Sequence, residues 1–195
     1  MCLLPQQFLY LRLRDSVDFK YCQMKPIYYL LFLFTVTLSA QDIESFSWKE
    51  AKLNDKIELT LTQDLFEKKY KADSIASPEI GECCFDDESI RMVYYKGAKY
   101  EMYNGQLKFR SIDFSKKKGM YFSIENDWFD HTTTIKNFMK TYPNASEFIE
   151  DGYMDDGDIY DMIVLMPKDE DSYEWRFYFN DDGKLHSIEC WPYCD

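Results

Sequence analysis

The sequence predicts an α+β fold in which two tandem units, each a helix–loop–helix followed by an antiparallel meander, form a curved sheet with helices on one side. Two observations support this prediction. The phrase FRSIDF at 109–114 returns as LHSIEC at 185–190, and amphipathic helical stretches precede strand-rich stretches twice, in the same order. A duplicated unit that ends each time in a similar strand explains both observations.

Each predicted unit begins with an amphipathic helix. In HTTTIKNFMKTYP (131–143), apolar residues recur at helical spacing between a Thr cap and a Pro stop, and TLTQDLFEKKYKA (60–72) has a similar pattern. At an offset of 72 residues, the matched positions are Thr62, Phe66, Lys68 and Tyr70 with Thr134, Phe138, Lys140 and Tyr142. NASEFIEDG (144–152) predicts a second short helix, and SPEIG (77–81) predicts its shorter counterpart.

Strand signals follow each predicted helix pair. The first unit contains IRMVYY, AKYEMY, QLKFRSIDF and GMYFSIEN, and the second contains DIYDMIVLM, YEWRFYF and KLHSIECW. Turns of the Lys-Gly, Asn-Gly and Asp-Gly types separate them, as in β-hairpins. Within YEWRFYF, alternation predicts that Trp175, Phe177 and Phe179 face the core and that Tyr178 lies on the other face.

The beginning of the chain predicts export. MKPIYYLLFLFTVTLSA (24–40) has the basic start, apolar run and small-residue exit of a secretory signal peptide, so we expect cleavage after Ala40 and a secreted or periplasmic protein. The apolar run is short for a stable membrane span, although a retained signal anchor is the alternative. The remaining expected divisions are an upstream leader at 1–23, an N-terminal segment at 41–56, a first repeat unit at 57–126 and a second at 127–195.

The charge of the chain suits a basic partner or a cationic ligand, and solubility alone is the alternative reason for it. The formal net charge is −12, and removal of the four Lys and Arg and two Asp in residues 1–40 leaves −14. Such a surface repels nucleic acid and anionic lipid. EDGYMDDGDIYD (150–161) predicts a solvated turn, and the carboxylates of Asp155, Asp156 and Asp158 are candidates for contact with a cationic partner. The stretch does not fit the ligand register of a helix–loop–helix calcium loop, which leaves an irregular calcium site as the alternative.

The cysteines predict disulfides. Cys83, Cys84, Cys190 and Cys194 remain after signal cleavage, an even count that is typical of disulfide-bonded exported proteins. Three pairings are open, and we favour those that join the first two cysteines to the C-terminal pair, because a bridge between adjacent residues strains the chain. Three residues separate Cys190 from Cys194, a spacing that matches neither common zinc motifs nor redox motifs.

The sequence contains no motif of a known catalytic site. The part after residue 40 has His131 and His186, but no Gly-x-Ser-x-Gly, phosphate-binding Gly-rich loop or His-Glu-x-x-His. We therefore expect neither an enzyme nor a cofactor. The aromatic residues Tyr178, Trp191 and Tyr193 are candidates for contact with a partner, because Tyr and Trp offer large, rigid contact areas.

The repeated pattern of helices and meander, in an exported chain of this size, resembles the β-lactamase inhibitory protein family. The second unit, from IKNFMKTYPNA to FNDDGKLHSI, also resembles a PepSY-like domain. The resemblance spans most of 57–192 and implies a curved sheet that grips another protein, but it transfers no target-contacting residue. We expect an exported, non-catalytic protein-binding module, such as an inhibitor or immunity-type protein that acts on a secreted or periplasmic protein. The alternative is a cell-envelope domain that binds a small or extended ligand.

Overall fold

Strands dominate the described part of the chain. The computed structural model describes residues 44–79, 88–154, 157–169 and 172–193, all within the unit Asp42–Asp195, and the predicted leader and signal peptide lie outside these residues. Strands account for 49% and helices for 12% of the structure. The fold is therefore mostly β, and the predicted α+β fold with helix–loop–helix repeats is wrong.

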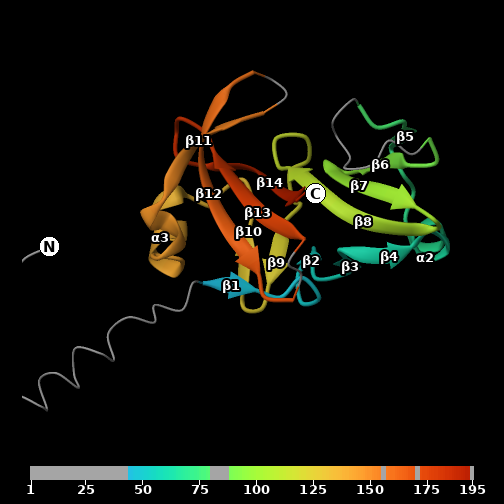
Figure 1. Cartoon of the computed structure of the whole chain (residues 1–195), viewed down its shortest axis with the longest axis horizontal. Coiled ribbons are helices and arrows are strands. Elements are labelled where there is room, and N and C mark those ends of the chain that lie inside the picture. The colour runs from blue at the N-terminus through green and yellow to red at the C-terminus, as the bar shows by residue number, and fades with distance from the viewer. Residues whose placement is uncertain (1–43, 80–87, 155–156, 170–171, 194–195) are drawn as a thin grey trace, which may run out of the picture. The chain divides into compact units, whose positions relative to one another are not determined.

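Ten of the described strands form one large sheet (Figure 1). Eight of them are hydrogen-bonded in the order β1-β12-β13-β14-β8-β7-β6-β5, while β11 pairs with β12 and β4 pairs with β8. Neighbours are antiparallel except for β1 and β12, which are parallel. The strands are β1 Ser45–Phe46, β4 Thr60–Thr62, β5 Ser74–Ala76, β6 Arg91–Tyr95, β7 Ala98–Tyr103, β8 Gln106–Asp113, β11 Ile149–Tyr153, β12 Ile159–Pro167, β13 Tyr173–Phe179 and β14 Leu185–Pro192.

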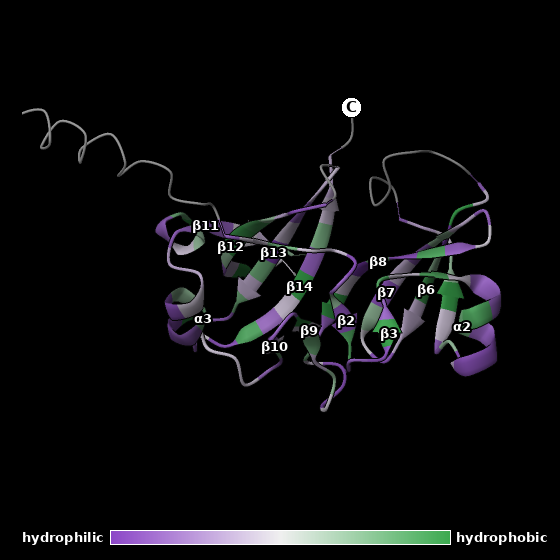
Figure 2. Cartoon of the chain, turned by 90° about the horizontal axis from the view of Figure 1, so that it is seen from below, coloured by the Kyte–Doolittle hydropathy of each residue, from purple (hydrophilic) through white to green (hydrophobic). Residues whose placement is uncertain are grey.

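A small sheet and two α-helices of the described chain pack against one face of the large sheet. The small sheet has the order β10-β9-β2-β3, and Figure 2 shows it between α3 and α2. Side chains from both helices and both sheets belong to one buried cluster. The bounds of these elements are β2 Lys52–Leu53, β3 Ile57–Glu58, β9 Phe122–Ile124, β10 Asp127–Phe129, α2 Gln63–Lys69, α3 Ile135–Thr141 and the 3-10 turn η1 Ala145–Glu147.

Aromatic rings fill the space between these layers. Trp175 on β13 lies 5.0 Å from Trp48 and 5.2 Å from Phe122 between ring centroids, and Phe177 lies 4.8 Å from Phe138 on α3. Trp175, Phe177 and Phe179 are fully buried, which confirms the core face predicted from alternation. Aromatic pairs in such stacked, tilted and edge-to-face arrangements stabilise a core beyond the burial of their area.

The two helices have matching ends. The Thr62 hydroxyl accepts a hydrogen bond from the Leu65 amide at 3.3 Å, and that of Thr134 accepts one from the Asn137 amide at 3.3 Å, so Thr is the N-cap of both. Each helix has seven residues and one buried aromatic side chain, Phe66 or Phe138. Since seven residues are too few for a helix that is stable alone, packing of this one ring decides whether each helix forms.

The second helix predicted for each unit does not form within the described residues. After α3, residues 145–147 make a single 3-10 turn and the chain then enters β11. The Glu44 carboxylate accepts hydrogen bonds from the amides of Asn144 and Ala145, so a distant side chain caps this turn. Residues 77–79 are not helical, and 80–81 lie outside the described residues. The prediction was wrong because long-range strand pairing of 149–153 overrides the local capping signal.

The two similar sequence segments, 109–114 and 185–190, pair with each other. β8 and β14 are antiparallel, with Ile112 opposite Ile188 and Ser111 opposite Glu189. The helix starts also match, since the amide of Gln63 donates to the Gly105 carbonyl at 2.8 Å and that of Ile135 donates to the Gly183 carbonyl at 2.8 Å. The duplication itself stays a prediction.

Tyr178 is buried rather than facing a partner. Only 1% of its surface is exposed, and its ring packs with Tyr160 and Met162 on the opposite face of the sheet from the main core. Its hydroxyl donates to Glu189 at 3.1 Å, and burial and that carboxylate raise its pKa. The ring lies over Gly152 of β11, where an added Cβ would be 2.7 Å from Cε1 of the tyrosine. The predicted role of Tyr178 in partner contact is therefore wrong.

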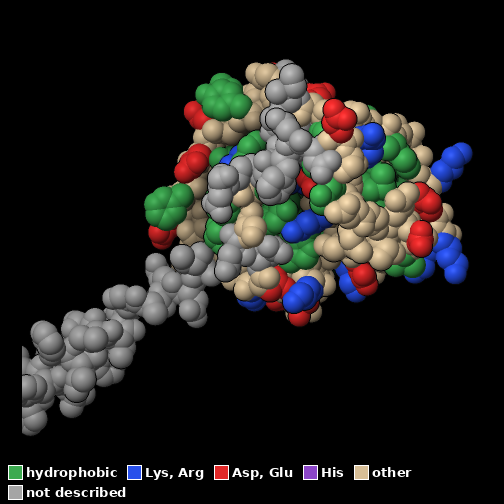
Figure 3. Space-filling model, turned by 45° about the vertical axis from the view of Figure 1, so that its right-hand side comes forward, with side chains coloured by type: hydrophobic (Ala, Val, Ile, Leu, Met, Phe, Trp, Pro, Cys, Tyr) green, Lys and Arg blue, Asp and Glu red, His purple; other side chains and the backbone are tan. Residues whose placement is uncertain are grey.

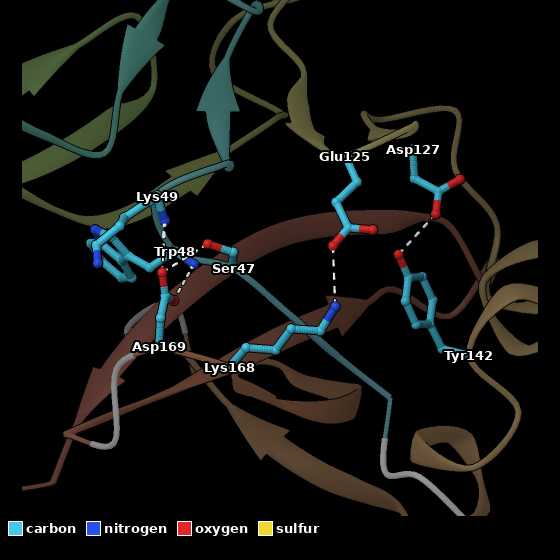
Figure 4. A network of polar contacts seen from close by, with 8 residues as sticks. All are labelled: Ser47, Trp48, Lys49, Glu125, Asp127, Tyr142, Lys168 and Asp169. Carbon is cyan, nitrogen blue, oxygen red and sulfur yellow. Dashed lines mark hydrogen bonds and ion pairs between the residues drawn. The ribbon is translucent and has the colours of Figure 1, made fainter.

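The N-terminal segment is part of the core. Phe46, Trp48 and Leu53 are buried, and Asp169, which follows β12, holds this segment in place (Figure 4). The Asp169 carboxylate accepts bonds of 2.7 Å from the Ser47 hydroxyl and the Trp48 amide. Desolvation acts to raise the pKa of Asp169, but these hydrogen bonds outweigh it and lower the pKa below 3.8.

Two further contacts fix the turn between β9 and β10 (Figure 4). Lys168 Nζ lies 3.2 Å from a Glu125 carboxylate oxygen, and the Tyr142 hydroxyl donates to Asp127 at 2.9 Å. Burial, followed by this hydrogen bond, raises the pKa of Tyr142. These contacts connect the small sheet to β12 and to the end of α3.

Replacement of Gly152 by Ala should destabilise the protein by about 1–3 kcal/mol, because the new methyl group overlaps the Tyr178 ring and the Met162 side chain. Urea denaturation of wild type and variant measures this difference. Glu150→Ala, at an exposed position of the same strand, is the control and should change stability by about 0.5 kcal/mol or less. Equal unfolding midpoints for G152A and wild type would contradict the packing argument.

Asp169→Asn should lower the unfolding free energy at pH 7 by about 0.5–1 kcal/mol, since solvent weakens hydrogen bonds to an exposed carboxylate. A carboxyl group whose pKa is lower when folded stabilises the protein above its unfolded pKa and loses this effect as pH falls through its folded pKa. The difference between wild type and variant should therefore shrink as pH falls below 3.8 and vanish only below the lowered pKa of the folded state. Denaturation at pH 7 and at a series of lower pH values tests this, with Asp181→Asn as the control. A difference that persists unchanged in acid would refute the role of the charge.

Candidate protein-binding surface

β11 lies at the margin of the large sheet (Figure 1), and several side chains on and beside it are exposed. Phe148 is 72% exposed and Tyr153 is 71% exposed, and Ile159 of β12, directly opposite Tyr153, is 54% exposed. The exposed Ile149, Glu150 and Asp151 lie between them along the chain. We call these six residues the β11 surface. Monomeric proteins rarely leave several large apolar side chains together in solvent without a function for them.

Strand length explains why this surface is not covered. β12 pairs with β13 only from Asp161 to Leu165, but it pairs with β11 as far as Ile159. The pair of Tyr153 and Ile159 therefore extends beyond the end of β13 and beyond the aromatic core. At the other end of β11, Ile149 lies opposite the fully buried Ile163. The surface thus begins at the core and continues past it.

β11 is also an edge strand. Among the described strands it pairs with β12 and with no other. Alternate backbone N–H and C=O groups of an edge strand point away from the sheet, where they are available to another chain. An edge with five residues in register is long enough to serve as a template for pairing.

Acidic side chains accompany the apolar ones. Residues 127–195 hold 17 Asp and Glu against five Lys and Arg, whereas 57–126 hold 12 against 11. Neither Glu150 nor Asp151 has a Lys or Arg within ion-pair distance among the described residues. On the face shown in Figure 3, acidic and hydrophobic side chains project along the left margin, and most Lys and Arg project from the other margins.

The structure separates the predicted partner residues. Trp191 is 43% exposed beneath the Arg176 guanidinium, and Tyr193 is 47% exposed. The Tyr193 hydroxyl donates to Glu174 at 2.7 Å, which raises its pKa to about 12. Both residues lie at the end of β14 where Tyr173 pairs with Pro192, which is opposite to the end of the sheet that carries Tyr153. They therefore do not form one surface with β11.

The acidic stretch is only partly described. Asp155 and Asp156 lie outside the described residues, while Asp158 is exposed and lines an open hollow of about 780 Å³ together with Tyr160, His186 and the β13–β14 turn. In the described part of the chain, no group of three or more His, Cys, Asp or Glu side chains is arranged to hold a metal ion. The described residues therefore provide no set of ligands for the irregular calcium site that the sequence left open.

The structure does not test the predicted disulfides or the predicted signal peptide. Cys190 is buried on β14, but Cys83, Cys84 and Cys194 lie outside the described residues, so the disulfides stay predictions. The structure has, within the described ranges, no helix long and apolar enough to cross a membrane.

A second hollow lies over the paired phrases of β8 and β14. Its floor includes Ser111, Asp113, Ser187 and Glu189, and its volume is about 500 Å³, within the range of ligand pockets. The His186 ring lies tilted against Tyr160 with centroids 4.8 Å apart, and its Nε2 lies 4.0 Å from Asp113. The other charged residues of the hollow are Asp73, Lys96, Lys99, Lys116 and Lys117.

Sequence reasoning missed the apolar residues of the β11 surface. Phe148 and Ile149 were included in a predicted helix, and Ile159 was included in a strand without a prediction of its exposure. The local pattern gave no clear signal for β11, because Ile149 and Tyr153 are four residues apart, a spacing that fits a helix as well as a strand, and Asp151 between them is polar.

Tyr153→Thr and Ile159→Thr should each change the unfolding free energy by about 0.5 kcal/mol or less, because both side chains are exposed and Thr, like Tyr and Ile, has a high strand propensity. Ile163→Ala, in the same strand as Ile159 but fully buried, should lower the unfolding free energy by about 2–5 kcal/mol. Urea denaturation compares the three variants. Losses of similar size at all three positions would mean that the exposed residues support the fold.

No family model, curated protein or solved structure matches this chain. The likeness to the β-lactamase inhibitory protein family and to PepSY-like domains therefore stays a prediction from sequence. We therefore infer the function from the chain's own surfaces. The β11 surface is more distinctive than the hollow over β8 and β14.

Proposed function

We propose that this protein is an exported, non-catalytic module that binds a basic protein through the β11 surface, as an inhibitor or immunity-type protein does. The observation that carries the proposal is the exposure of Phe148, Tyr153 and Ile159 beside Glu150 and Asp151. Export rests on the signal peptide predicted at 24–40. The target belongs to the same compartment, as a secreted or periplasmic protein.

The composition of the surface favours a protein partner. Aromatic residues are enriched at protein interfaces, where a central apolar patch is surrounded by polar groups. Here two aromatic rings and two isoleucines form the apolar part, and the carboxylates of Glu150 and Asp151 adjoin it. A partner that covers the rings removes apolar area from water, which is the main source of favourable binding energy.

The charge of the surface favours a basic partner. The excess of 12 negative charges in 127–195 gives this part of the chain a negative potential, to which Glu150 and Asp151 contribute on the surface itself. Such a potential accelerates association with a positively charged protein and repels acidic ones. Because this attraction acts between exposed groups, salt should weaken it.

A second candidate function is the binding of a small ligand over β8 and β14. The observation that favours it is the hollow of about 500 Å³, in which lysines and carboxylates surround Ser111 and Ser187. Polar groups that converge on one hollow are typical of small-molecule sites. A ligand there would leave the β11 surface free, so substitutions on that surface distinguish the two functions.

An affinity experiment tests the proposal. The tagged protein, purified under oxidising conditions, should capture one stoichiometric basic protein from the exported proteins of its source, and raised salt should weaken the capture. The double variant Tyr153→Thr/Ile159→Thr should reduce capture at least about tenfold, because loss of a central interface residue commonly costs more than 1 kcal/mol. Tyr103→Thr removes a tyrosine that is 41% exposed in the first half and should not change capture.

Two results would contradict the proposal. One is equal capture by wild type, by the double variant and by Tyr103→Thr, which would place the contact elsewhere. The other is no capture at low salt, which would favour the small-ligand function over β8 and β14.

A further inference from the structure

We propose that the partner binds by adding an extended basic segment as a new strand to the free edge of β11. This inference rests on the proposed function and names how the β11 surface engages its partner. It follows from three features of β11, which are its open edge, its fixed register and the order of its side chains.

β11 is the longest open edge strand in the described residues. β11 has five residues in register with β12, whereas β5, at the other end of the large sheet, has three. The outermost strands of the small sheet, β10 and β3, have three and two residues. An added strand gains main-chain hydrogen bonds in proportion to its paired length, so β11 offers more of them than the other edges.

The strand is held in place before binding. The Tyr178 ring lies over Gly152 and leaves no room for a side chain there, and the tyrosine hydroxyl is hydrogen-bonded to Glu189. This contact fixes β11 from one face, while its pairing with β12 fixes it from one edge. A rigid template loses little conformational freedom when a partner strand pairs with it, which favours affinity.

The side chains of β11 define the partner segment. Ile149, Asp151 and Tyr153 share one face of the strand, and Glu150 points to the other face. A strand beside β11 would place apolar residues next to Ile149 and Tyr153, and Lys or Arg next to the two carboxylates, since opposite charges and apolar pairs stabilise neighbouring strands. The partner segment therefore has five paired residues, with an apolar residue at each end and basic residues between them.

A designed peptide tests this inference without knowledge of the natural partner. The blocked heptapeptide Thr-Ile-Lys-Lys-Lys-Ile-Thr fits the pattern and reads the same in both directions, so it requires no assumption about strand direction. It should bind the full chain, and Asp151→Asn should weaken binding and its salt dependence. A peptide with Glu in place of each Lys keeps the apolar positions and should not bind.

Backbone methylation separates strand addition from contact by side chains alone. Successive N–H groups of a strand point to opposite edges, so only one of two adjacent amides faces β11. A peptide N-methylated at its third residue and one N-methylated at its fourth should differ at least tenfold in affinity. Amide exchange of alternate β11 residues should slow about tenfold at a peptide concentration ten times Kd.

The outcomes distinguish this inference from the proposed function. Equal binding of the two methylated peptides, with binding lost in Tyr153→Thr/Ile159→Thr, overturns strand addition and leaves the β11 surface as a side-chain contact. No binding of any peptide, together with a captured protein that depends on Tyr153, also overturns it. A peptide complex that forms with unchanged β11 exchange, or dimers of the protein in place of a complex, contradicts it as well.

Discussion

The antiparallel pairing of β8 with β14 is the contact on which the rest of the structure depends. It joins a four-stranded group, β5 to β8, to the group formed by β11 to β14, and Ile112 and Ile188 meet at its centre. It also brings Phe109 on β8 next to Trp175 on β13 in the aromatic core. The pairing also places the polar residues of both phrases, Ser111 and Ser187 among them, on the opposite face of the sheet, where they form the floor of a hollow.

Trp175 shows how the layers depend on one another. Its ring contacts Phe46 and Trp48 from the N-terminal segment, Phe109 from β8 and Phe122 from the small sheet. One side chain of the second half thus packs against three other parts of the chain. Because protein interiors are close-packed, a substitution of Trp175 would disturb the packing of all three parts.

Local signals predicted the local features of the fold. The Thr caps of both helices, the buried faces of Phe66 and Phe138, and the inward face of β13 follow from patterns of period 3.6 and 2. The sequence did not predict that Glu44 caps the turn at Asn144, that Gly152 admits the ring of Tyr178, or that β12 extends past β13. Each of these features depends on residues that are distant in sequence, and a local sequence pattern cannot predict such a contact. The β11 surface was missed for the same reason, since its exposure results from the length of a neighbouring strand.

The position of β1 has a consequence for how the chain folds. β1 pairs with the end of β12, and the bond between the Trp48 amide and Asp169 spans 121 residues. Contacts of such sequence separation form slowly, since a long loop must close before they stabilise anything. A chain that emerges from a ribosome or an export channel with its N-terminus first cannot complete this core until β12 to β14 have followed. The N-terminal segment therefore stays without its packing partners until nearly the whole chain has been released.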